Sequence, residues 1–488
     1  MVSIQAFNSR LSAVVALLTT LFLAGCSIPQ PDPRKEMTEM APTGGWDAGG
    51  EAGPVANDWI ATFNDSKLVD LVNEAQEANP DLAATAASLS AAIAQARQAN
   101  SALFPQLDAG AVAKQFHIFE LTEEERFLGL ERNDTELGIS LDLAWELDVW
   151  GRISDSAKSA ALSASATAAD YAAARQSLAG QVAKGWFQAI TAKQQLELAE
   201  EFVANFAETF RITEARFNAG DVSAQDTFTA KADLANSRQD VEEARFSLRF
   251  SIRSLEILLG RYPSTDLSIA DSLGSELVDV PAGLPSTLLE RRPDLIAADR
   301  RVASAFFLAN SASAARLPQF SLSASYQSTS DNFGDLFDAK SMLVNIGLNL
   351  FQPLFDAGLR RAEFEEAEAD QMVAVATYQS TALSAFQEVE DALSLEKSLF
   401  EQVHELEIAA ESYEKAREIG EIRYREGETD LTSLLVVQRE ALAAQADLLT
   451  AQGQLFTNRV DLYLALGGNF EEGPINDSPA PPPLPSQE

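Results

Sequence analysis

The sequence has very few of the residues that usually hold metals or form disulfides. Among 488 residues there are one cysteine, two histidines and five methionines, and neither His117 nor His404 has a second histidine or a cysteine near it in the chain. We therefore expect no disulfide framework, no zinc or soft-metal site and no cofactor. Basic residues are also scarce, at 36 against 73 acidic ones, for a net charge of −37. This imbalance argues against binding to nucleic acid, whose phosphates attract clustered lysine and arginine.

An apolar stretch lies at the N-terminus. Residues 11–24 follow a single charged residue, Arg10, and are too short for an ordinary spanning helix, which is typical of a signal peptide. They end in Leu23-Ala24-Gly25-Cys26, which resembles the bacterial lipobox, so residues 1–25 would be removed and Cys26 would carry a covalent lipid. Several acyl chains on Cys26 would anchor the protein stably. Ser27, in place of an aspartate, resembles lipoproteins sent to the outer membrane. The alternative is a cysteine buried in a core helix.

Two segments are predicted to be irregular. Residues 26–56 are rich in proline, glycine and acids, and they predict a lipidated tether whose glycines lack the spacing of a phosphate-binding loop. Residues 471–488 end in SPAPPPLPSQE and predict a disordered tail.

An internal repeat organises the chain between these segments. Two motifs recur: Asn79-Pro80-Asp81-Leu82 as Arg292-Pro293-Asp294-Leu295, and Phe104-Pro105-Gln106-Leu107 as Leu317-Pro318-Gln319-Phe320. The prolines of the two motifs are 25 residues apart in both repeats, and both Gly151 to Gly220 and Gly358 to Gly427 span 69 residues. The interval from the second proline to the next of these glycines differs, at 46 and 40 residues, which predicts an insertion in a surface loop. The sequence therefore predicts one repeat over residues 57–275 and a second over residues 276–470.

Each repeat is predicted to contain a helix, two strands and two further helices. Pro80 and Pro293 suit the first turn of a helix, because the missing N–H of proline costs nothing there. Alternation of apolar and polar residues from Thr135 to Val149 predicts a strand, and the two hairpins are placed at about 107–149 and about 320–352. A seam of apolar and small residues from Leu178 to Phe210 predicts a long helix. A helix that covers most of the 69-residue interval would reach about 100 Å, at 1.5 Å per residue.

The strands predict a pore shared by several copies of the chain. No segment after the signal peptide has the run of about 20 apolar residues that a spanning helix needs, so a membrane crossing would require a closed β-barrel. Four strands cannot close alone, since the smallest membrane barrels use about eight. The alternative is two half-buried hairpins in a soluble sandwich. The lipobox and the matching positions of the hairpins favour the shared barrel.

A series of motifs runs in order from about Trp59 to Phe470. Besides the repeated motifs it includes Trp145-Glu146-Leu147-Asp148-Val149-Trp150-Gly151-Arg152, Glu290-Arg291-Arg292 and Leu464-Ala465-Leu466-Gly467-Gly468. The series resembles the TolC-like outer-membrane efflux family, specifically its lipoprotein (NodT-type) branch. The resemblance implies a mainly α fold: a homotrimer with a membrane β-barrel of about 12 strands and a long α-helical barrel across the periplasm.

The resemblance also implies a function without enzymatic activity. Such a channel passes small molecules to the exterior through a pore that is gated at its periplasmic end. The expected partners are a periplasmic adaptor (a membrane fusion protein), an inner-membrane pump of the RND type and the lipids of the outer membrane. Two alternatives stay open: a periplasmic lipoprotein scaffold without a pore, and a channel for protein secretion.

The same resemblance places the gate at two helix turns. Gly220 and Gly427 match these turns, and Asp226 and Tyr424 match a tyrosine–aspartate contact between neighbouring helix pairs. The alternative for Tyr424 is an amphipathic helix residue whose ring is packed and whose hydroxyl is wet.

The second turn departs from the family pattern. Ser433 and Val436 stand where relatives carry gate aspartates, and Thr429 stands where some carry an arginine. Three acids in the same turn would form a substitute ring around the pore axis: Glu426, Glu428 and Asp430. Such a ring would favour cations, and the alternative is a solvated turn.

Overall fold

The computed structural model describes residues 31–41, 45–49, 58–117, 123–127, 133–274, 277, 280–283 and 285–468. The predicted signal peptide, Cys26 and the predicted tail lie outside these residues. The described chain divides into two compact units, which we call the sheet unit and the helical unit. The sheet unit comprises Gln98–Ala160 and Val302–Val375, and the helical unit comprises Pro33–Arg97, Ala161–Arg301 and residues 376–468.

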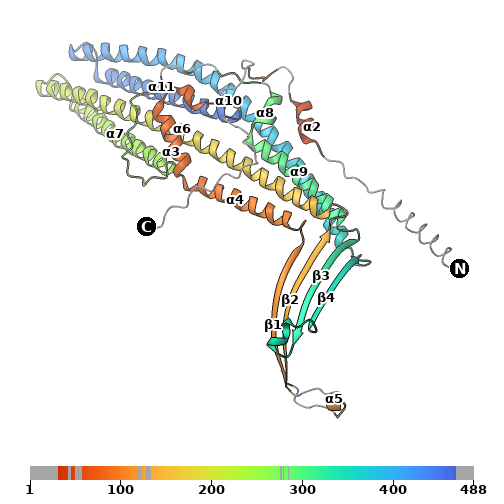
Figure 1. Ribbon diagram of the computed structural model, residues 1–488. Helices are drawn as coiled ribbons and strands as arrows, with labels where there is room; N and C mark the ends of the chain where they lie inside the picture. Colours follow the sequence, from red (N-terminus) through yellow and green to blue (C-terminus); the bar gives the residue numbers. More distant parts are fainter. Residues whose placement is uncertain are drawn as a thin grey trace. The chain divides into compact units, whose positions relative to one another are not determined.

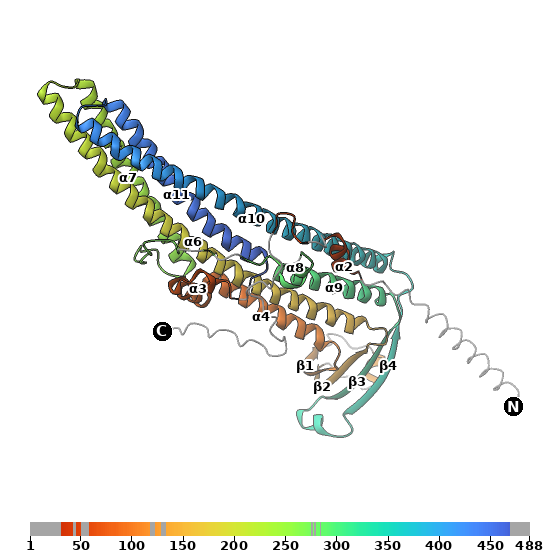
Figure 2. The same ribbon diagram turned by 90° about the horizontal axis from the view of Figure 1, so that it is seen from above.

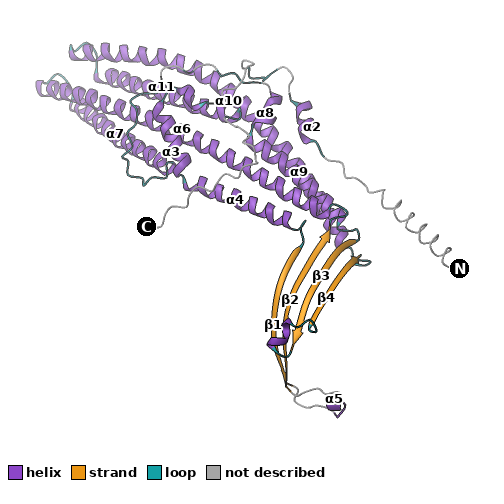
Figure 3. Ribbon diagram, viewed as in Figure 1, coloured by secondary structure: helices purple, strands orange, loops and turns teal. Residues whose placement is uncertain are grey.

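Helices make up most of the described chain (Figure 3). In the first repeat they are α3 (Ser66–Ala78), α4 (Pro80–Ser101), α6 (Arg152–Ala219) and α7 (Ala224–Leu258), and in the second α8 (Pro285–Arg291), α9 (Pro293–Ala314), α10 (Leu359–Arg425) and α11 (Leu431–Ala465). Short elements complete the set: α2 (Pro33–Met40), η1 (Ile60–Phe63), α5 (Glu123–Phe127) and η2 (Phe333–Phe337). The predicted long helices are confirmed, since α6 has 68 residues and α10 has 67. Pro80 and Pro293 begin helices as predicted.

The sheet unit contains one antiparallel sheet with the strand order β1-β2-β3-β4 (Figure 1). Its strands are β1 (Gln106–His117), β2 (Asn133–Leu147), β3 (Gln319–Ser330) and β4 (Met342–Phe351). Both predicted hairpins are confirmed, but β2 ends at Leu147 and not at Val149. The side chain of Asp148 accepts the backbone N–H groups of Ile153 and Ser154 at 2.9 and 2.8 Å, which caps the start of α6 in place of continuing the strand.

The register gives the sheet one apolar and one polar face. On the apolar face Leu322 of β3 lies opposite Leu348 of β4, and Ala324 lies opposite Ile346. On the other face the pairs are Ser323 with Gly347 and Ser325 with Asn345. Ile346 is 77% exposed, so no part of the chain that the structure describes covers the apolar face at this position. As for the helices of the described residues, not one combines the length and the apolar character that crossing a membrane requires.

In the helical unit α6, α7, α10 and α11 run side by side (Figures 1 and 2). All four contribute to one apolar core, in which Phe202 and Phe206 of α6 meet Leu234 of α7 and Leu434 of α11. The predicted seam of α6 is buried in this unit, where Val182 and Ala189 are fully covered. Tertiary packing thus stabilises helices far longer than those of an ordinary globular domain.

The prediction of an irregular tether is wrong for part of its described residues. Pro33–Met40 form α2, and the side chains of Met37 and Trp46 are buried. The indole N–H of Trp46 donates to the carbonyl of Ala282 at 2.9 Å. Glu390 of α10 accepts the backbone N–H groups of Asp47 and Ala48, both at 2.8 Å. The proline and glycine content hid these contacts, because their partners lie more than 230 residues away in the sequence.

Candidate functional site

Both long helical hairpins turn on a glycine with positive φ. Gly220 follows α6 with φ at 87°, and Gly427 follows α10 with φ at 77°. In each turn the residue after the glycine donates its N–H to the carbonyl five residues earlier: Asp221 to Arg216 at 2.9 Å, and Glu428 to Arg423 at 2.8 Å. This is the Schellman arrangement, in which glycine tolerates the left-handed conformation that ends a helix. The two predicted turns are confirmed.

The helices that follow the turns are capped by the same two residue types in reversed order. Ser223 caps α7 by accepting the N–H of Asp226 at 3.2 Å, and Asp226 accepts the N–H of Ser223 at 2.9 Å. At α11 it is Asp430 that accepts the N–H of Ser433, at 2.8 Å. Ser433 holds the position of Asp226 relative to its glycine, so the second turn keeps its acid three residues earlier. The hydrogen bonds from the backbone and side chain of Ser433 lower the pKa of Asp430.

Tyr424 and Asp226 are not partners within one chain. The side chain of Tyr424 is 1% exposed, and its hydroxyl oxygen lies 2.8 Å from Oγ1 of Thr213. Because Thr213 donates its own hydroxyl to the carbonyl of Thr209, Tyr424 is the donor. The alternative of a wet tyrosine hydroxyl is therefore wrong. A tyrosine–aspartate contact between two copies of the chain stays a prediction.

Arg216 joins the two hairpins beside the turns, and the sequence analysis did not single it out. Its Nη1 donates to the carbonyl of Tyr424 at 3.0 Å, and its guanidinium lies 5.0 Å from the centre of the Tyr424 ring. The signal for it was present, since Arg216 and Arg423 stand four residues before the two turn glycines. The two repeats therefore carry an arginine at the same position with different partners. Arg216 of the first repeat binds Tyr424 of the second, whereas Arg423 of the second repeat pairs with Glu428 in its own turn.

Two of the three acids predicted for a ring have partners inside the chain. Glu428 forms an ion pair with Arg423 at 3.7 Å, and Asp430 caps α11. The side chains of Glu426 and Glu428 are exposed. The acidic ring at this turn stays a prediction.

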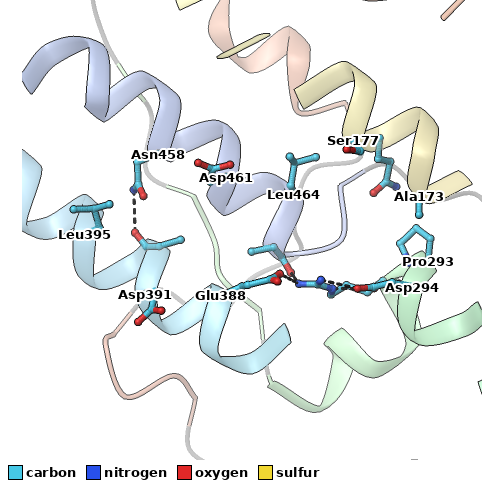
Figure 4. A pocket seen from close by; sticks show the side chains of 14 residues that line it. Ala173, Ser177, Pro293, Asp294, Glu388, Asp391, Leu395, Asn458, Asp461 and Leu464 are labelled. Carbon is cyan, nitrogen blue, oxygen red and sulfur yellow. Dashed lines mark hydrogen bonds and ion pairs between the residues drawn. The ribbon is translucent and has the colours of Figure 1, made fainter. Parts of the chain in front are cut away.

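A cavity in the helical unit surrounds the Arg-Pro-Asp motif of the second repeat (Figure 4). Its volume is about 510 Å³, and its carboxylates come from Asp294, Glu388, Asp391 and Asp461. Arg292 is buried beside it and donates to both carboxylate oxygens of Asp294, at 3.0 and 2.7 Å. Arg292 also pairs with Glu388 and lies 3.4 Å from the carbonyl of Ala465. The motif thus ties the start of α9 to α10 and to the end of α11, which is a structural role.

No group of three or more histidine, cysteine, aspartate or glutamate residues in the described ranges is arranged to hold a metal ion.

The sequence profile of the family described as "Outer membrane efflux protein" matches residues 71–261 and 284–468. The chain belongs to this family. Among its relatives is the solvent efflux pump outer membrane protein SrpC of Pseudomonas putida, which is 32% identical over 93% of this chain and 97% of its own length. The two matched ranges fall within the two repeats that the sequence predicted.

Solved structures of outer-membrane channels share the fold of this efflux protein. The outer-membrane channel OprN is similar with a TM-score of 0.80 at 29% identity, covering 91% of this chain and 99% of OprN. The CmeC outer membrane channel of Campylobacter jejuni is similar with a TM-score of 0.82 at 25% identity, covering 86% of this chain and 90% of CmeC. The resemblance to the efflux family and the mainly α fold with a smaller sheet part are confirmed.

Proposed function

We propose that this efflux protein is the outer-membrane channel of a tripartite efflux system. It passes small molecules from an inner-membrane pump of the RND type, through a periplasmic adaptor, to the exterior. The observation that carries the proposal is the similarity to outer-membrane channels over 91% of the chain, in both the helical and the sheet parts. The energy for transport comes from the pump, and this protein supplies a path that opens and closes.

The two edges of the sheet support an oligomer, and the resemblance to the efflux family implies that it has three copies. In the described residues β1 and β4 each pair on one side only, so their outer edges carry unpaired N–H and C=O groups. Such groups cost several kcal/mol each in lipid. Three copies that join edge to edge form one closed ring of about 12 strands, which satisfies every edge. The apolar face with Leu348 and Ile346 then meets lipid, and the polar face with Asn345 lines the path.

Membrane insertion tests the assignment of the two faces. Ile346→Asp places a charge on the apolar face, and Asn345→Asp places the same charge one residue away on the polar face. A charge that faces lipid near the midplane costs about 2 to 4 kcal/mol for lysine or arginine and less for aspartate, and this cost applies in every copy of the oligomer, whereas a charge that faces water costs little. We expect Ile346→Asp to lower the yield of assembled trimer in the outer membrane at least tenfold and Asn345→Asp to leave it unchanged. Equal yields for the two variants would contradict the proposal.

Conductance tests the pore itself. The purified protein in planar bilayers should give ion currents, and its mass in detergent should be that of three chains. A monomer without current, released intact from the membrane by cleavage of its lipid anchor, would favour the scaffold instead. If Glu426, Glu428 and Asp430 form a ring, the current should prefer cations.

The lipid anchor is part of the same proposal. Cys26, after removal of residues 1–25, carries the lipid, and several acyl chains suffice for stable anchoring. Labelled palmitate should enter the wild-type protein and not Cys26→Ser. Palmitate in the serine variant would overturn the assignment.

A further inference from the structure

A row of polar side chains, three of them buried and three half-buried, joins α6, α10 and α11 near the second turn. We call it the polar row, and it comprises Thr209 of α6, Glu414, Arg417 and Glu421 of α10, and Gln438 and Gln445 of α11. All six residues belong to the helical unit. The exposed fractions are 3% for Thr209, 8% for Arg417 and 0% for Gln438. Polar groups this deep in a helical bundle need partners at fixed positions.

Gln438 is the centre of the row because it joins three helices. Its side-chain amide nitrogen donates to Oγ1 of Thr209 on α6 at 3.0 Å and to Glu421 on α10 at 3.1 Å. An amide nitrogen has two hydrogens, so both are used. The hydrogen bonds of one side chain therefore fix the position of α11 relative to α6 and to α10.

Arg417 continues the row away from the turn. Its guanidinium donates to Glu421 at 2.6 Å and to Glu414 at 2.9 Å, and Gln445 of α11 donates to the same Glu414 at 3.1 Å. The hydrogen bond from Arg417 lowers the pKa of Glu414, which keeps this carboxylate charged. Each charge in the row is thus matched by a hydrogen-bonding partner of the opposite sign or by an amide.

The first repeat lacks this row. With the offset of 207 residues that separates Gly220 from Gly427, the equivalents of Glu414 and Arg417 are Ala207 and Phe210. These two apolar residues pack against the shared core of the four long helices. The equivalent of Gln438 is Lys231, whose side chain is exposed. Only the α10–α11 hairpin is therefore fastened by buried hydrogen bonds at these positions.

Apolar contacts and buried hydrogen bonds respond differently when a helix slides or twists. An apolar contact loses little when a helix shifts, since one methyl group replaces another. A buried amide or guanidinium loses its partners at once, and the unpaired group is strongly unfavourable. Buried polar residues are for this reason known to specify register in helical coiled coils. The row thus permits one register of α10 and α11 against α6.

We propose that Gln438 and Thr209 are positioning residues that hold α10 and α11 in one register against α6, so that breaking their hydrogen bond loosens the second turn. This inference rests on the proposed channel function. Tyr424, with its hydrogen bond to Thr213, lies between the row and the turn and transmits the position of α6 to Gly427.

The test is a double variant that keeps packing and removes the hydrogen bond. Thr209→Val with Gln438→Leu replaces both partners by apolar groups of similar shape, which leaves few unpaired groups. The matched control is Gln225→Leu with Thr229→Val, the same two changes at exposed positions of α7 beside the first turn. Thr209→Val alone and Thr209→Ser form a milder pair, in which only the serine keeps the hydroxyl.

Two readouts on the purified full chain decide the outcome. We expect the double variant to raise the conductance of the closed state at least threefold and to speed amide hydrogen exchange in residues 420–436 at least fivefold, with a melting midpoint within about 5 °C of wild type. The control should match wild type in both readouts. Thr209→Ser should behave as wild type, and Thr209→Val should lie between wild type and the double variant.

Other results would contradict the proposed role of Gln438 and Thr209. Unchanged conductance and exchange in a folded double variant would overturn the proposal, and so would equal behaviour of Thr209→Val and Thr209→Ser if the double variant does not assemble. A wild-type protein that forms no pore would instead refute the proposed function. In that case hydrogen exchange still decides whether Gln438 and Thr209 position the turn.

Discussion

The hydroxyl of Tyr424 on α10 donates a hydrogen bond to Oγ1 of Thr213 on α6, with the two oxygens 2.8 Å apart and both side chains buried. This bond joins the second helical hairpin to the first, three residues before the turn glycine Gly427. Arg216, which is also on α6, contacts the same residue through the carbonyl and the ring of Tyr424. Tyr424 therefore holds the second turn to α6 in two ways, through its side-chain hydroxyl and through its backbone carbonyl.

Tyr424→Phe removes this hydrogen bond and keeps the ring. We expect the free energy of unfolding to fall by about 1 kcal/mol, because Thr213 still donates to the carbonyl of Thr209 and loses only its incoming bond. Thermal unfolding of the purified protein measures the loss. Tyr413→Phe is the control, since the Tyr413 side chain is 39% exposed on the same helix. Equal losses in the two variants would contradict the role of the buried hydroxyl.

Two glycines on α10 and its turn should respond to alanine with opposite signs. Gly427 has φ at 77°, so Gly427→Ala should destabilise the protein by about 1 to 2 kcal/mol through backbone strain. The space is not the obstacle, because the nearest atom to an added Cβ, in the Arg216 side chain, is 3.7 Å away. Gly420 lies within α10, where alanine favours the helix by about 0.5 to 1 kcal/mol and an added Cβ meets Leu434 at an ordinary 3.5 Å. A loss of stability in Gly420→Ala as large as that in Gly427→Ala would refute this account.

The cap of α11 should weaken in acid. Its hydrogen bonds to Ser433 hold the pKa of Asp430 below the ordinary value of about 3.9. A lowered folded-state pKa means that the stabilisation is fully present above about pH 4 and is lost as the pH falls through the folded value. The protection factors of the amides at the start of α11, which correct the exchange rates for their intrinsic pH dependence, should fall over this range. Asp430→Asn keeps an oxygen acceptor that does not titrate, so its exchange should follow the ordinary pH dependence of amides.

A second change tests the reversed order of the two caps. The double variant Asp430→Ser with Ser433→Asp copies the arrangement of Ser223 and Asp226 at α7. We expect α11 to keep its hydrogen-exchange protection in this variant and to lose it in Asp430→Ala. Loss of protection in both would show that the two turns are not equivalent.

The hydrogen bonds between Glu390 and the N-terminal segment predict a change in protease sensitivity. Glu390→Ala removes the carboxylate that accepts the backbone N–H groups of Asp47 and Ala48, so residues 45–49 should be cleaved several-fold faster in limited proteolysis. Asp391→Ala changes the next residue, whose side chain is exposed, and should leave the rate unchanged. Equal rates in both variants would mean that Trp46 alone holds the segment.

The helices and strands could be predicted because they follow from local patterns. Alternation around Leu141 and Leu143 has the period of a strand, and the interval from Gly151 to Gly220 leaves room for one long helix. The turn glycines were predictable for the same reason, since a left-handed residue after a helix favours glycine. The partner of Asp226 is local, since Ser223 and Asp226 form a capping box, whose spacing is a sequence pattern. The partner of Tyr424 was not predictable, because Thr213 lies 211 residues away and only packing brings the two side chains together.

The sequence by itself determined the duplicated plan of this efflux protein: two repeats, their long helices, their hairpins and the glycines at which they turn. These features depend on period and spacing, which are properties of neighbouring residues. The tertiary structure decided which polar residues are buried together, such as Gln438 with Thr209, and which loop partners with Trp46. These pairs lie more than 220 residues apart, so their energies depend on how the helices pack and not on any local pattern.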